Sequence, residues 1–243
     1  MKRALLILSS IWLLLAPGPA ARAQLSAELQ AFQEAAGDHG ILFRGKQATR
    51  YTFLFNGNPY WDNATFGTGD IVCEGNFYHG MTLNINAHKQ QVLVRMADSP
   101  HAIALTPSQA PSFTIDGRRY VGIASGDVLP EGIYAVLGDG PVHIYKHVEK
   151  YLYYATKSVN GDLIGYYDPD YRADISRYFH IRTFYYFQDA DGNFSRIRTR
   201  GALLRKFPGR KKEIRQALYG LTLDPTALGF DAYCEAVLNI VAP

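Results

Sequence analysis

The side chains that could carry out chemistry in this sequence are few and scattered. Asp168, Asp170 and Asp174 lie close together in the segment YYDPDYRAD. Paired carboxylates can serve as general acid and base in a hydrolase, or they can bind a cation. Aspartate in a proline-containing loop also accepts backbone hydrogen bonds in turns. The segment therefore favours a turn and leaves a carboxylate-dependent hydrolase as an alternative.

Two other patterns suggest a metal site, and the spacing of both argues against one. Segment 189–193 alternates oxygen ligands, but an EF-hand needs three such ligands before its glycine and a glutamate at position twelve, where this chain has Arg200. We predict a hairpin turn there. On a strand, His143 and His147 would lie about 13 Å apart, too far to share a metal ion. We predict no catalytic residue, no metal and no cofactor.

Aromatic residues are dense in the second half of the chain, with thirteen between positions 145 and 187. Rings exposed on a sheet can stack on sugars or hold a peptide or protein partner, whereas inward rings form core. Tyr151 and Tyr153 should share one face of a strand, and Tyr154 should face the other way. The candidate binding residues in this segment are Tyr151, Tyr153, Tyr166 and Tyr185.

A basic segment provides a second candidate surface. Between Arg196 and Arg215 there are nine basic residues and one acidic residue, Glu213. Such a segment can bind an anionic glycan, an anionic lipid or an acidic protein, although solvated helix faces have the same composition. Its candidate residues are Arg205, Lys211 and Lys212.

The elements that must position these side chains are mostly strands, because short apolar or alternating runs are separated by Gly, Asn and Asp. The predicted strands are 51–55, 71–74, 77–86, 91–97, 101–105, 113–115, 119–124, 133–137, 142–147, 151–157, 163–167 and 182–188. Turn sequences at 75–76, 116–117, 138–140 and 160–161 suit hairpins, so successive strands should be antiparallel neighbours. The expected architecture is a meander forming a sandwich or an open barrel.

Helices are predicted at both ends of this β-rich region. A short one spans 26–36, Thr199 can cap another that ends before Pro208, a third contains Ile214 and Leu218, and the last begins near 224. The apolar stripe of the last helix needs a surface to cover, and the sheet provides one. The fold class is therefore mainly β (α+β), in a single domain 24–243 whose helical part begins at about 199.

The N-terminus has the three parts of a secretory signal peptide. Lys2 and Arg3 precede an apolar run over 4–16, and Ala21 and Ala23 place small residues where a signal peptidase cleaves. The run is short for a bilayer, and the residue directly after position 23 is not a cysteine, which argues against a lipid-anchored lipoprotein. We predict cleavage of residues 1–23 and a periplasmic or secreted mature chain with 22 basic and 22 acidic residues. That balance and compartment disfavour nucleic acid as a partner.

The two cysteines, Cys73 and Cys234, allow two arrangements. A disulfide is permitted in an exported chain, and closing a loop of about 160 residues would stabilise the fold by roughly 5 kcal/mol at most. Alternatively, each is a separate buried thiol that packs as a small apolar side chain.

Two stretches carry a resemblance to known proteins. FNGNPYWDNATFGTGDIVCEGNFYHGMTLNIN (55–86) and TFYYFQDADGNFSRIRTRGALLRKFPGRKKEIRQAL (183–218) resemble exported β-rich proteins common in Bacteroidota-type bacteria. The resemblance implies a location in the cell envelope and implies no activity.

These observations lead to one functional hypothesis and two alternatives. We expect an exported, non-catalytic cell-envelope protein that binds or supports an envelope protein, a glycan or an anionic lipid. The alternatives are an envelope hydrolase using Asp168 and Asp170, and an outer-membrane β-barrel. The barrel is disfavoured because the final segment reads as a helix, without the aromatic-ended last strand of such proteins.

Overall fold

The computed structural model describes residues 40, 42–95, 101–125, 129–154, 156–157, 163–164, 177–221 and 228–242. The chain divides into two compact units, Met1–Arg44 and Gly45–Pro243. The described part of the first unit contains the 3-10 helix η2 (Leu42–Arg44). The predicted helix 26–36 and the predicted turn 160–161 lie outside the described residues.

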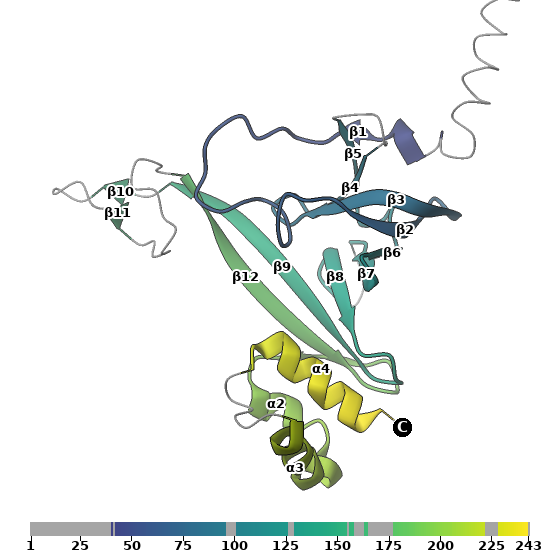
Figure 1. The fold of residues 1–243 in the computed structure, drawn as a ribbon, viewed down its shortest axis with the longest axis vertical. Coiled ribbons are helices and arrows are strands. Elements are labelled where there is room, and N and C mark those ends of the chain that lie inside the picture. The colour runs from purple at the N-terminus through teal and green to yellow at the C-terminus, as the bar shows by residue number, and fades with distance from the viewer. Residues whose placement is uncertain are drawn as a thin grey trace, which may run out of the picture. The chain divides into compact units, whose positions relative to one another are not determined.

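The second unit is built on one antiparallel sheet of eleven strands, in the order β1-β5-β4-β3-β2-β6-β7-β8-β9-β12-β13 (Figure 1). The strands are β1 (Lys46–Gln47), β2 (Gly67–Cys73), β3 (Asn76–Asn86), β4 (Gln91–Arg95), β5 (Ala102–Leu105), β6 (Ser112–Ile115), β7 (Arg118–Ile123), β8 (Gly132–Leu137), β9 (His143–Tyr154), β12 (Arg177–Gln188) and β13 (Phe194–Ile197). A separate pair is formed by β10 (Thr156–Lys157) and β11 (Leu163–Ile164). The large sheet is open, with β1 and β13 at its edges, and the expected antiparallel, mainly-β fold is confirmed.

Two meanders make up this sheet, one from β2 to β5 and one from β6 to β13. They meet at β2 and β6, where Ile71 pairs with Phe113 and Val72 with Ser112, and where the N–H of Asp116 donates to the Thr68 carbonyl oxygen at 2.8 Å. The turn between β3 and β4 also reaches the second meander. There the Gln90 amide donates to the carbonyl of Val148 at 2.8 Å and accepts from the backbone N–H of Ile133 at 3.0 Å. The first meander is therefore held to β8 and β9 as well as to β6.

Two hairpin turns show why the sequence folds into adjacent strands. Asp116 and Gly117, between β6 and β7, have φ of 48° and 78°, as expected for a two-residue turn that follows the twist of the strands. Glu74 and Gly75 have φ of 49° and 81° between β2 and β3, one residue earlier than predicted. Glycine is the natural choice at the second position of both turns.

Several predicted strand bounds differ from those in the structure, and the short strands β1 and β13 were not predicted. Segment 51–55 forms no strand. It is held by contacts of its aromatic side chains rather than by strand pairing, because the ring centroids of Tyr51 and Phe55 lie 6.0 and 5.1 Å from that of Phe179. The predicted strands 142–147 and 151–157 are largely one strand, β9, which runs through Lys150 without a break.

The C-terminal helices pack on the sheet, as predicted. They are α2 (Arg200–Leu204), η3 (Pro208–Arg210), α3 (Lys211–Leu221) and α4 (Phe230–Val241), and α4 lies across the end of β9 and β12 (Figure 1). Thr199 caps α2, its hydroxyl accepting from the N–H of Ala202 at 3.1 Å. The shared core contains Ile144, Phe187, Leu203, Leu204, Ile214, Leu218, Tyr233, Val237 and Leu238.

A polar clamp fixes the start of α4 to the sheet. The Asp231 carboxylate accepts hydrogen bonds from the Lys146 ammonium and from the Tyr185 hydroxyl. Since Lys146 and Tyr185 lie on β9 and β12, one carboxylate at the first turn of α4 joins the helix to both strands.

Candidate functional site

The long strands β9 and β12 separate two faces of the sheet, because successive side chains on a strand point to opposite sides. One side of these strands carries the buried residues Ile144, Val148, Phe179 and Phe187, and we call this side the inner face. The other side, which carries Tyr145 and Tyr151, is the outer face. Pairing of Tyr145 with Tyr186 and of Tyr151 with His180 places the even-numbered residues of β12 on the outer face too.

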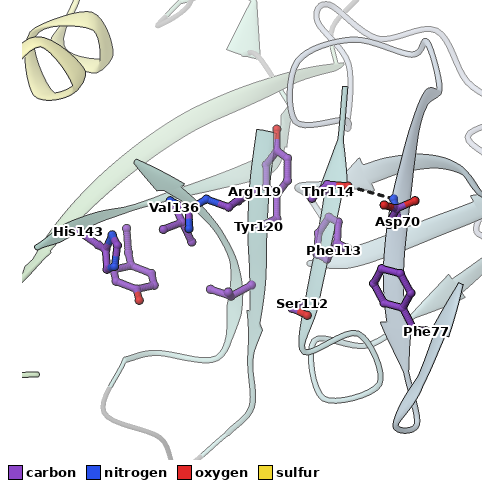
Figure 2. Close-up of a pocket in the computed structure, with 11 residues that line it drawn as sticks. Asp70, Phe77, Ser112, Phe113, Thr114, Arg119, Tyr120, Val136 and His143 are labelled. Carbon is purple, nitrogen blue, oxygen red and sulfur yellow. Dashed lines mark hydrogen bonds between the residues drawn. The ribbon is translucent and has the colours of Figure 1, made fainter. Parts of the chain in front are cut away.

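The outer face contains a hollow of about 370 Å³, which we call the trough. It crosses β2, β3, β6, β7, β8 and β9, so six strands contribute to it. Figure 2 shows Asp70 and Phe77 at one side, His143 at the other, and Arg119 and Thr114 between them. The lining residues are Asp70, Phe77, Ser112, Phe113, Thr114, Arg119, Tyr120, Val121, Val136, His143 and Tyr145.

Hydrogen bonds hold the polar groups of the trough in place. The Thr114 hydroxyl accepts from the Asp70 N–H at 3.0 Å, and the Asp70 carboxylate accepts from the N–H of Gly80 at 3.0 Å. The Arg119 guanidinium donates to the Asp139 carboxylate at 2.8 Å. It also donates to the Gly138 carbonyl oxygen, and because an arginine has five N–H donors, these two contacts leave donors for a ligand.

The orientation of His143 follows from its contact with the main chain. Its Nδ1 lies 3.0 Å from the carbonyl oxygen of Gly138, which can only accept, so Nδ1 is assigned the proton. A neutral ring then carries its lone pair on Nε2, which is an acceptor. The trough therefore combines a fixed donor, Arg119, with fixed acceptors.

Aromatic rings stand on strands at either side of the trough. On β3, Phe77 is 57% exposed and packs edge-on against His79, with ring centroids 4.3 Å apart. On β9, Tyr145 donates to the Gln188 side chain at 2.9 Å and contacts Phe194 at 5.4 Å. Burial raises the pKa of Tyr145, so its hydroxyl remains protonated.

The tyrosines singled out from the sequence are divided between the two faces. Tyr151 and Tyr153 share the outer face, as predicted, and are 38% and 40% exposed. Tyr153 stacks on Tyr178 at 5.8 Å between ring centroids, and the Arg182 guanidinium lies 5.0 Å from the ring centre of Tyr151. These residues form a partly exposed surface of rings and arginine beyond the trough.

Tyr185 is not brought together with Tyr151 and Tyr153. It lies on the inner face beneath α4, where its ring centroid is 4.7 Å from that of Phe230. Burial and the hydrogen bond to the Asp231 carboxylate raise the pKa of Tyr185. Tyr166 and the aspartates at 168, 170 and 174 lie outside the described residues.

The basic candidates are exposed but separate from the trough. Arg205 follows α2, and Lys211 and Lys212 begin α3, in the helical layer that covers the inner face. The neighbouring Arg210 has a structural role, because its guanidinium donates to the carbonyl oxygens of Ile240 and Val241 at 3.0 Å each.

The remaining polar candidates have structural explanations. Cys73 and Cys234 are both buried, free thiols, and burial raises the pKa of Cys234 to about 12. Segment 189–193 is the turn between β12 and β13, as predicted, and the Asp189 carboxylate accepts from the N–H of Asn193 at 2.8 Å. Within the described ranges, no three His, Cys, Asp or Glu side chains gather as a metal site.

The sequence did not predict the trough: His143 was considered only as a metal ligand and rejected, and Tyr145 was only one of the thirteen aromatic residues of segment 145–187. The residues of the trough come from strands that lie far apart in the sequence, and only the turn at Asp116 offered a local signal. A hairpin there places Thr114 opposite Arg119 on one face.

Among the described segments, no helix is both long and apolar enough to cross a membrane. In comparisons with known proteins, no family model, no curated protein and no solved structure matches this chain.

Proposed function

We propose that this protein is an exported cell-envelope binding protein whose trough holds a short glycan. The observation that carries the proposal is the combination, in one hollow, of the exposed ring of Phe77 and the half-buried ring of Tyr145 with fixed hydrogen-bonding groups. Its volume of about 370 Å³ lies in the lower part of the range of small-ligand pockets.

The chemistry of the lining residues suits a sugar. The ring faces of Phe77 and Tyr145 can pack on the C–H face of a sugar, while the guanidinium of Arg119 donates to its oxygens. Acceptors for sugar hydroxyls are the Asp70 carboxylate and Nε2 of His143. A ligand with one apolar face and several hydroxyls would use both kinds of group.

The export part of the proposal is supported by the sequence. The basic residues at positions 2 and 3, the apolar run and the small residues at 21 and 23 follow the order of a secretory signal. The resemblance of segments 55–86 and 183–218 to exported envelope proteins agrees with this location. Secretion of the full chain from a bacterial host, with N-terminal sequencing of the product, tests this part independently of ligand binding.

Glycan binding is tested with residues 24–243 on an array of bacterial envelope glycans, followed by titration calorimetry with the best hit. Phe77→Ala should weaken binding about tenfold, equivalent to roughly 1.4 kcal/mol, by removing one ring. Ser112→Trp should abolish it by filling the trough from β6. Tyr219→Ala is the control, because Tyr219 is exposed on α3, outside the trough.

Two outcomes would overturn the glycan proposal. One is the absence of any bound glycan at millimolar concentration. The other is a hit whose affinity is the same in the wild type and in Ser112→Trp, because such a ligand would bind elsewhere.

A further inference from the structure

The edge of β12 that lies away from β9 is only partly paired. On the other edge β12 pairs with β9 over all of Arg177–Gln188, but β13 covers the edge away from β9 only from Tyr185 to Gln188. At the other end of that edge, Asn56 forms a bridge with Tyr178. Within the part of the chain that the structure describes, nothing pairs with the edge between these two contacts.

The main-chain groups of Ile181 and Thr183 point into this gap. On the same edge, the N–H of Phe179 donates to the Asn56 carbonyl at 3.1 Å, and the N–H of Asp189 donates to Asn193 at 3.1 Å. Hydrogen-bonding direction alternates along a strand, and the register of β12 against β9 is regular throughout. The odd-numbered residues between these positions therefore direct their N–H and C=O groups outward.

We propose that this gap accepts, by strand addition, an extended acidic segment of a partner protein. An added strand forms main-chain hydrogen bonds to an exposed sheet edge, and alternate side chains provide selectivity. From Phe179 to Tyr185 the strand advances by about 20 Å, which leaves room for about five residues. This interaction surface is separate from the trough and does not depend on what the trough binds.

The side chains around the gap select the partner's pattern. On the outer face, His180 and Arg182 are exposed on β12 and Arg196 is exposed on β13. The guanidinium of Arg182 lies over the ring of Tyr151, and that of Arg196 lies 4.6 Å from the ring centre of Phe184. A guanidinium stacked on a ring keeps its N–H groups in its own plane, where they can donate to a partner. Carboxylates on a paired strand would meet these cations.

On the inner side of the same edge the exposed side chains are apolar or neutral. Ile181 is 54% exposed, and Thr183 is also exposed. Charged residues such as arginine can prevent another strand from pairing with a sheet edge. An exposed isoleucine on the same edge instead offers an apolar contact to an added strand. The matching segment therefore alternates acidic and β-branched residues.

The probe is the peptide acetyl-Glu-Val-Glu-Val-Glu-amide with a fluorescent label, titrated with residues 24–243 and followed by anisotropy. We expect saturable binding that is at least tenfold tighter than that of the corresponding Lys-Val peptide. Hydrogen exchange should slow in segment 177–188 when the peptide is bound. A version of the peptide methylated on its valine nitrogens should not bind, because it cannot complete the main-chain hydrogen bonds.

The matched protein variants are Thr183→Pro and Thr183→Ala. Proline removes the outward N–H of residue 183 and should abolish binding, without removing a hydrogen bond to β9. Alanine keeps that N–H and should bind as the wild type does. Equal binding of the acidic and lysine peptides, or of the methylated and unmethylated peptides, would overturn the proposal, and this comparison holds even if Thr183→Pro fails to fold. Self-association of the wild type that is lost in Thr183→Pro would also overturn it, in favour of a second copy of the chain.

Discussion

Lys150 is a buried ammonium whose removal should stabilise the protein at neutral pH. It lies on the inner face of β9, is 5% exposed, and donates to the Asn58 side chain at 3.1 Å. Burial lowers the pKa of Lys150 from 10.5 to about 8, although the charge of Asp62 opposes the shift. A fall of roughly 2.5 pKa units corresponds to about 3 kcal/mol of unfolding free energy lost at pH 7.

The sign of the pH dependence follows from which state binds the proton. Because the folded-state pKa is below the unfolded value, the unfolded chain binds more protons between pH 8 and 10.5, so the unfolding free energy rises with pH across that interval. Below pH 8 the full penalty applies. Lys150→Met should therefore stabilise the protein at pH 7 by about 2 kcal/mol, after about 1 kcal/mol is subtracted for the lost hydrogen bond to Asn58. By pH 10 the gain should fall to within about 1 kcal/mol of zero.

Urea unfolding measures this directly. Trp61 is the only tryptophan between residues 24 and 243 and is buried, so its fluorescence reports unfolding. Lys89→Met is the control for the loss of one positive charge, because Lys89 is exposed on the turn between β3 and β4. A stability gain from Lys150→Met that is the same at pH 7 and pH 10, or a loss at pH 7, would refute the reasoning.

Three further substitutions test the contacts that hold the fold. Asp231→Asn should lower the unfolding free energy by about 1–2 kcal/mol, since Lys146 loses its partner charge and Tyr185 a charged acceptor, and the loss should shrink in 1 M salt. Gly122→Ala should cost about 3 kcal/mol or prevent folding, because a Cβ there would lie 2.2 Å from the Pro107 carbonyl oxygen, and thermal unfolding of the two chains compares them. Gly220→Ala, by contrast, should raise stability by about 0.5–1 kcal/mol in the same assay, because a Cβ at this position in α3 meets nothing within 4 Å.

The sequence predicted the strands whose neighbours are local, and the boundaries failed where distant residues decided the outcome. The Asp116–Gly117 hairpin could be read directly, because its turn residues fix the pairing of β6 with β7. Lys150 could not be placed, because it is buried by a segment about ninety residues earlier that contains Asn58. The alternation of side chains within one strand does not show which distant segment of the chain will bury one of its residues.

The candidate site was predictable only in part for the same reason. Alternation correctly placed Tyr151 and Tyr153 on one face, since that relation depends on a single strand. Whether a face is covered depends on other elements of the fold. The helix α4 covers Tyr185. The trough is lined by Phe77 and Tyr145, which lie on strands far apart in the sequence.

The order of the two meanders along the chain has a consequence for how the sheet folds. The first meander is complete once residue 105 has been synthesised, and its Leu83, Ile85 and Val92 are buried in the folded protein. The Gln90 contacts that hold it span 43 and 58 residues of sequence. We therefore expect the first meander to expose apolar surface until β8 and β9 have formed and dock against it. We expect docking of the two meanders to limit the folding rate and neither half to persist as a stable fragment.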